Sequence, residues 1–151
     1  MAKTVQTRSR VKIRDMRVED LEGVLDIERE TKEDSRAVTY APVPDSCIGG
    51  EMSASVVAEQ GDKIVGFVLG RVVSSPTELR SIAWIELIGI LPEYQRKGIG
   101  KKMVESWKKR CRKKGINKVH VMVNWRDWWM LSFFESLGFC RGDLTDLQAE
   151  L

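Results

Sequence analysis

Residues 86–101 read ELIGILPEYQRKGIGK, and this stretch predicts the centre of the fold: a strand, a turn, a glycine-containing loop and the start of a helix. Around its first half, the run 84–91 is almost wholly apolar, as expected of a strand covered on both faces. Pro92 cannot continue a strand ladder, so the strand should end there. A helix should follow over 101–111, because apolar residues recur every four positions along one face: Ile99, Met103, Trp107 and Cys111.

Gly98 and Gly100 lie between the predicted strand and the N-terminus of the predicted helix. Backbone amides at a helix N-terminus have no partner within the helix, and the helix dipole adds partial positive charge, so such a loop suits a phosphate group. A P-loop would need glycine at position 95 and Ser or Thr at 102, where this chain has Gln95 and Lys102. A dinucleotide fingerprint would need glycine in place of Met103. Both nucleotide motifs are therefore excluded.

The spacing Gln95-x-x-Gly98-x-Gly100 resembles the pyrophosphate-binding motif of the GNAT superfamily, the acyl-CoA-dependent N-acyltransferases. A glycine pair alone is more often a tight turn. Here the preceding hydrophobic strand, the helix behind the loop, and Pro92, six residues before Gly98, also fit the motif.

The stretch 133–139, FFESLGF, resembles the closing motif of the same superfamily, in which a helix runs into Leu-Gly-Phe and a final strand. Two positions depart from that motif. Asp127 stands where Asn is most often found at the helix start, and Phe134 stands where Tyr is often found. With these landmarks the resemblance covers about residues 10–140.

The resemblance implies an α/β fold of the GNAT type: a mixed, mostly antiparallel twisted sheet with helices on both faces and a splayed central strand pair, 84–91 and 118–124. We expect a single N-acetyltransferase domain over 1–151, with 1–9 as a flexible arm. Gly66 and Gly70 should mark a bulge or close packing. Periodicity predicts the remaining elements: a strand near Val11 and Ile13, a helix over 18–30, hairpin strands 55–59 and 63–73, and a helix over 128–137 with Asp127 as its N-cap.

The resemblance also implies that acetyl-CoA, the acyl donor, lies in the split between the two central strands. Its pyrophosphate would rest on amides from Arg96 to Lys101, and its pantetheine arm would pair with backbone near Ile88 and Ile90. Gly89, inside the strand, suits a bulge beside this arm. The residues that we expect to contact the coenzyme are Ile88, Gly89, Ile90, Gln95, Arg96, Lys97, Gly98, Ile99, Gly100, Lys101, Asp127 and Phe134.

Glu86 is the candidate catalytic residue, because it is a carboxylate in an otherwise apolar strand, two residues from the expected pantetheine contact. An amine must lose its proton to attack a thioester, and a carboxylate there could accept it. The alternative is a Glu86 that faces solvent or pairs with an arginine such as Arg71. A backbone amide near Ile88 or Ile90 could polarise the thioester carbonyl. The sole histidine, His120, is expected to be packed or exposed rather than catalytic.

Composition is that of an ordinary globular domain, with 42% hydrophobic and 31% charged residues. The three cysteines, Cys47, Cys111 and Cys140, lack metal-ligand spacing and predict reduced thiols in a cytoplasmic protein without a metal. No apolar run approaches the roughly 20 residues of a membrane span, and residues 1–4 lack a signal-peptide core, so no membrane partner is expected. A homodimer is left open.

The net charge of +3 conceals a basic stretch, 96–114, in which ten basic side chains stand against one acid, Glu105. One interpretation is a nucleic-acid surface. The favoured interpretation is a solvated helix face, and charge near the loop would also attract the phosphates of coenzyme A.

Two functions follow. The favoured one is an N-acetyltransferase that transfers the acetyl group of acetyl-CoA to a primary amine: a peptide N-terminus, a lysine or a small amine. The alternative is a non-catalytic acyl-CoA-sensing or nucleic-acid-associated module. The segment 31–54, which includes Tyr40, is expected to border the acceptor site.

Overall fold

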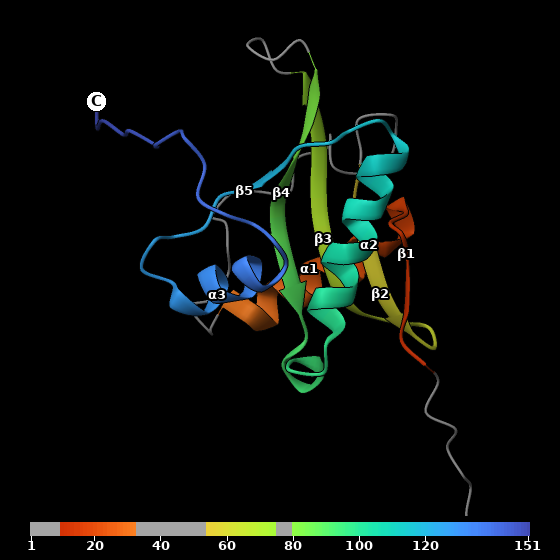
Figure 1. Ribbon diagram of the computed structural model, residues 1–151. Coiled ribbons are helices and arrows are strands. Elements are labelled where there is room, and N and C mark those ends of the chain that lie inside the picture. Colours follow the sequence, from red (N-terminus) through yellow and green to blue (C-terminus); the bar gives the residue numbers. More distant parts are fainter. Residues whose placement is uncertain (1–9, 33–53, 75–79) are drawn as a thin grey trace, which may run out of the picture.

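The computed structural model describes residues 10–32, 54–74 and 80–151 (Figure 1). The expected arm 1–9 and nearly all of the acceptor-side segment 31–54, Tyr40 included, lie outside the described residues. In chain order the elements are β1 (Lys12–Asp15), the 3₁₀ helix η1 (Val18–Asp20), α1 (Leu21–Lys32), β2 (Val56–Gln60), β3 (Lys63–Ser74), β4 (Ser81–Ile90), the 3₁₀ helix η3 (Pro92–Tyr94), α2 (Ile99–Lys113), β5 (Val119–Val121) and α3 (Trp128–Ser136).

The five strands form one open sheet in the order β1-β2-β3-β4-β5. Neighbours from β1 to β4 pair antiparallel, and β4 pairs parallel with β5. This arrangement confirms the expected mixed, mostly antiparallel sheet. The alternating runs on either side of Gly61 form the β2–β3 hairpin as predicted.

The splayed strand pair is confirmed as well. β5 pairs with β4 only along Ala83, Trp84 and Ile85, so the half of β4 from Glu86 to Ile90 extends past the paired region. The predicted strand 118–124 is therefore too long, since β5 covers only Val119–Val121. The alternating pattern continues after Val121, but there the segment has already diverged from β4 and no longer pairs with that strand.

Helices cover both faces of the sheet, as expected. α1 packs against β3 and β4 on one face, and α2 packs against β2 and β3 on the other (Figure 1). The predicted apolar stripe of α2 is buried over its whole length, from Ile99 to Cys111. β4 is less buried than its composition predicts: residues 88–90 are only half-buried, because β5 has already diverged from this half of the strand.

Gly70 and Gly89 show how close packing shapes β3 and β4. Leu69 pairs with Leu87 and Gly70 pairs with Ile85, so Glu86 is the extra, bulged residue between them. The expectation of a bulge at Gly89 is wrong. Gly89 pairs regularly with Phe67, and it is glycine because a Cβ there would lie 2.7 Å from the Phe67 ring.

The ends of the last two helices follow the sequence signals. Gly115 has a φ of +76° just past α2, where only glycine is unstrained. Asp127 caps α3 by accepting a hydrogen bond from Met130 N at 3.1 Å.

The prediction of a final strand after α3, which the closing motif implied, is wrong: residues 139–151 are described and form no strand. This tail lacks an alternating apolar pattern, and Leu144 and Leu147 are exposed.

Within the described ranges, none of the helices is long and apolar enough to cross a membrane.

Candidate functional site

A glycine-containing loop joins the free end of β4 to the N-terminus of α2. Arg96 and Gly98 both adopt left-handed backbone conformations, with φ of 57° and 77°. α2 then begins at Ile99 without a side-chain cap. Since Lys102 N donates to Gly98 O at 3.1 Å, the amides of Ile99, Gly100 and Lys101 precede the first helical hydrogen bond. These amides and the positive end of the helix dipole are groups that suit an anion, at the place where the spacing predicts a phosphate cradle; the loop 95–101 is called the cradle below.

The two glycines of the loop serve different purposes. A Cβ on Gly98 would meet nothing within 4 Å, so its backbone conformation is what calls for glycine. A Cβ on Gly100 would lie 3.1 Å from Ile90 Cδ1 and 3.3 Å from the Phe133 ring, so Gly100 lets α2 pack closely against β4 and α3. Gly98 is therefore the residue at which a new side chain would enter the cradle without disturbing the core.

Three side chains hold the loop in place. Gln95 Nε2 donates to Ile90 O at 3.1 Å, which ties the loop to the end of β4. Tyr94 Oη donates to Gln60 Oε1 at 2.7 Å, and Lys63 pairs with Glu93 at 3.5 Å. These contacts fix the loop to the β2–β3 hairpin, so the cradle is preformed.

Glu86 is the bulged residue of β4 and also the first residue of this strand that no longer pairs with β5. Arg71 Nε of β3 donates to Glu86 Oε1, and the two side chains are 43% and 20% exposed. The arginine pairing that the sequence left open is thus confirmed. A bulge re-aims a side chain, which explains how a carboxylate in an apolar strand leaves the core here.

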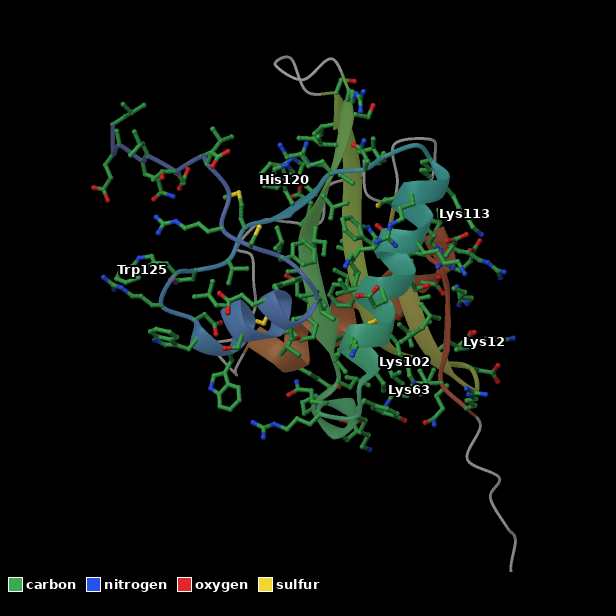
Figure 2. The ribbon with its side chains drawn as sticks, viewed as in Figure 1. Lys12, Lys63, Lys102, Lys113, His120 and Trp125 are labelled. Carbon is green, nitrogen blue, oxygen red and sulfur yellow. The ribbon has the colours of Figure 1, made fainter. Side chains whose placement is uncertain are left out.

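The side chains of Trp84 on β4 and His120 on β5 stack on each other, close to the point where the two strands separate. Their rings stack with centroids 4.6 Å apart and planes 21° from parallel. Figure 2 shows His120 on β5 beside β4. Of the two states expected for His120, packed or exposed, the structure shows the packed one.

Asp127 and Phe134, the two positions that depart from the closing motif, are both engaged within the protein. Asp127 caps α3, as described above. Phe134 is only 2% exposed and packs edge-on against Phe133 and Phe139, with centroids 5.1 and 5.2 Å away. The structure thus gives each of them a structural role.

The basic residues of α2 divide into two groups. Lys108 Nζ donates to Leu137 O at 2.7 Å and lies 5.7 Å from the Phe139 ring, and Arg110 pairs with Asp15 of β1. The others, among them Lys102 and Lys113, are exposed and mark the two ends of α2 in Figure 2. Among the described residues, no group of three or more His, Cys, Asp or Glu side chains could hold a metal ion.

One feature beside the cradle was not predicted from the sequence. Arg96 lies over the ring of Trp129, with its guanidinium carbon 5.1 Å from the centroid. The sequence did offer one signal for an aromatic surface here, because three of the five residues in the run Trp125-Arg126-Asp127-Trp128-Trp129 are tryptophans. The partner of Trp129 could not be read from the run, because Arg96 lies far away in the sequence.

Residues 51–141, more than half of the chain, match the family described as "Acetyltransferase (GNAT) domain". The chain therefore belongs to the GNAT acetyltransferase family.

Individual relatives agree with this family. Over 88 residues the chain is 28% identical to mycothiol acetyltransferase of Renibacterium salmoninarum, a match that covers 58% of this chain and 26% of that protein. The chain thus spans about a quarter of the length of this curated relative.

Two solved structures show the same fold. The aminoglycoside acetyltransferase meta-AAC0020, from an uncultured soil metagenomic sample and in complex with trehalose, has a TM-score of 0.73 and 22% identity, with 93% of this chain and 96% of that chain covered. Aminoglycoside N-acetyltransferase AAC(6')-Iy in complex with CoA has a TM-score of 0.76 and 16% identity, with 97% and 98% covered.

Proposed function

We propose that this protein transfers the acetyl group of acetyl-CoA to a primary amine by direct attack, with Glu86 as general base. The observation that carries the proposal is the arrangement along β4. A carboxylate stands at the bulge where β5 departs, the half of β4 that has β3 but not β5 as a neighbour comes next, and the glycine-containing loop before α2 follows the end of the strand.

The cradle suits the pyrophosphate of coenzyme A. Its donors are backbone amides of Ile99, Gly100 and Lys101, with Arg96 and Lys97 as neighbouring cations. On the side that β5 leaves open, β4 offers backbone groups near Ile88 and Ile90 to the amides of the pantetheine arm, as a sheet edge does to an added strand. Gln95, Gly89, Asp127 and Phe134 support this site from within the protein.

The acid–base chemistry needs one side chain. The attacking amine must be neutral, and we assign Glu86 to accept its proton. The hydrogen bond from Arg71 Nε to Glu86 Oε1 supports a carboxylate held in one orientation. Phe134 has no hydroxyl to protonate the departing thiolate. With an ordinary thiol pKa of roughly 8.5, that thiolate is a tolerable leaving group and can take its proton from water.

The proposed acceptor is a peptide N-terminus, a lysine or a small amine. The relatives named above include an enzyme for mycothiol and two for aminoglycosides. This range supports an amine acceptor and does not select one.

We further propose that the described ranges form one N-acetyltransferase domain, because a single hydrophobic core joins both faces of the sheet. A cytoplasmic location is supported by Cys111 and Cys140, which are both free thiols.

The second candidate is a nucleic-acid-associated module without catalysis, favoured by the exposed basic face of α2. Changing Lys109, Arg112 and Lys113 together to Glu would remove a salt-dependent affinity for RNA or DNA if that role is real. Under the enzymatic proposal, the same change leaves turnover at saturating acetyl-CoA intact.

Acetyl-CoA turnover against a panel of peptides and small amines tests the enzymatic proposal. We expect Glu86→Gln to lower kcat/KM by about 10²–10⁴-fold with little change in acetyl-CoA affinity, as removal of a general base does.

Two controls accompany that measurement. Arg71→Gln breaks the ion pair but keeps the carboxylate, so it should cost far less activity than Glu86→Gln. Glu105→Gln, on the exposed face of α2, should change nothing. A Glu86→Gln variant that turns over at the wild-type rate would leave Glu86 with a structural role alone.

A further inference from the structure

Three tryptophans close together in the sequence are exposed, which is unusual for so large an apolar side chain. Trp125, Trp128 and Trp129 are 75%, 76% and 63% exposed. Trp125 projects from the loop after β5 in Figure 2, with Arg126, its neighbour in sequence, stacked on its ring at 5.2 Å. Trp129 differs, because the cation over its ring is Arg96 of the cradle loop.

The packing of α3 places Trp129 beside the cradle. Phe133 stands against Gly100 in the first turn of α2, where a Cβ on Gly100 would lie 3.3 Å from its ring. Trp129 is four residues earlier, on the same face of α3 and one turn closer to the helix start. Asp127 fixes that start by its cap. The indole of Trp129 therefore lies beside the cradle, in contact with Arg96 of its loop.

Arg96 occupies a backbone conformation that its side chain does not favour. Among the described residues it is the one non-glycine residue with a positive φ, at 57°. Such a conformation costs on the order of 1 kcal/mol or more, which the surrounding contacts must offset. Glycine would relieve the strain but could not place a guanidinium over Trp129 at the edge of an anion-binding loop.

We propose that Trp129 is the stacking surface for the adenine ring of coenzyme A, with Arg96 pairing a phosphate of the same nucleotide. This inference rests on the proposed function, because it needs the pyrophosphate in the cradle. An adenine attached through its ribose to that pyrophosphate has to lie beside the loop, and an exposed indole offers it a π surface. A guanidinium recognises phosphate oxygens in a planar, two-pronged geometry.

The parts of the coenzyme would then be held in different ways: the pantetheine arm by the backbone of β4, the pyrophosphate by the amides of α2 together with Arg96, and the adenine by the side chain of Trp129. Truncating Trp129 should therefore weaken only ligands that carry the nucleotide.

Calorimetry with coenzyme A and with 4′-phosphopantetheine, which lacks the adenosine, tests this point. A stacked base contributes about 1–3 kcal/mol, so Trp129→Ala should weaken coenzyme A binding about 5- to 150-fold. Affinity for 4′-phosphopantetheine should stay unchanged. Trp129→Phe should restore most of the loss, since it keeps an aromatic face.

Trp125→Ala is the matched control, because Trp125 is also exposed and also has an arginine over its ring, yet its loss should leave coenzyme A affinity as in the wild type. Wild-type affinity in Trp129→Ala, or equal losses for both ligands, would overturn the inference. A wild-type protein that binds no coenzyme A would instead overturn the proposed function itself.

Discussion

The indole of Trp107 is completely buried, and its Nε1 is the one buried side-chain donor or acceptor atom without a hydrogen-bond partner in the part of the chain that the structure describes. It points at Gly70 on β3, where a Cβ would lie only 2.4 Å from Nε1. A single hydrogen atom in place of a side chain at Gly70 thus lets the largest core residue of α2 reach the sheet beside the bulge.

At this position we expect Gly70→Ala to lower the free energy of unfolding by about 1–3 kcal/mol, the usual cost of overpacking a rigid core. Urea unfolding followed by far-UV circular dichroism measures the difference. Gly142→Ala is the control, because a Cβ there meets nothing within 4 Å. Equal midpoints for Gly70→Ala and the wild type would mean that Trp107 does not pack against β3 in this way.

At the scale of elements, an ion-pair network joins β1, η1 and β2. Arg14 donates to both carboxylate oxygens of Asp20, at 2.7 and 2.8 Å, and to Glu59 at 3.1 and 3.2 Å. Asp20 also accepts from Arg17 N at 2.7 Å. These hydrogen bonds, of which those from Arg14 have the largest effect, hold the pKa of Asp20 below its ordinary value of 3.8.

This network predicts a pH dependence. Because the pKa of Asp20 is lower in the folded state than in the unfolded state, its contribution is complete above the unfolded value of 3.8 and is lost as the pH falls through the folded value. Asp20→Asn should therefore destabilise the protein more at pH 7 than at pH 3, because part of the contribution is already lost below pH 3.8. Denaturant midpoints of both proteins at the two pH values check this, with the exposed Asp62→Asn as control. A difference that is the same at both pH values would contradict it.

The buried stripe of α2 makes a chemical prediction. Burial raises the pKa of the Cys111 thiol to about 11, and its side chain is 0% exposed. Cys140 is exposed. A thiol reagent at pH 8 should label Cys140 rapidly and leave Cys111 unmodified until the protein unfolds. Mass spectrometry of the labelled peptides would refute this if Cys111 reacted at a similar rate.

Across the whole molecule, the sequence correctly predicted those structural elements that are determined by residues close together in the chain. The apolar run ending at Pro92, the four-residue period that begins at Ile99 and the acid at Asp127 correctly placed β4, α2 and the start of α3. These features depend on backbone geometry and on periodicity, and both can be read from a short window.

What the sequence could not predict depends on contacts between distant segments. The bulge at Glu86 rather than Gly89 follows from the register of β4 against β3, and the short β5 follows from where the strands diverge. The pairing of Glu86 with Arg71 remained one of several options, and the Arg96–Trp129 contact joins a loop and a helix that are far apart in the chain.

The central claim is that the loop before α2 holds the pyrophosphate of acetyl-CoA, and calorimetric titration of acetyl-CoA into wild type and Gly98→Trp tests it most directly. A Cβ at Gly98 would meet no protein atom within 4 Å, so the strain of a non-glycine residue at this positive φ stays in the loop and the core should keep its fold. The indole would then stand at the amides of α2. Circular dichroism verifies the fold, and Gly142→Trp controls for a new exposed indole. The account predicts one-to-one binding to the wild type and to Gly142→Trp, and no measurable heat with Gly98→Trp. Equal affinity in wild type and Gly98→Trp, or no binding to the wild type, would contradict it.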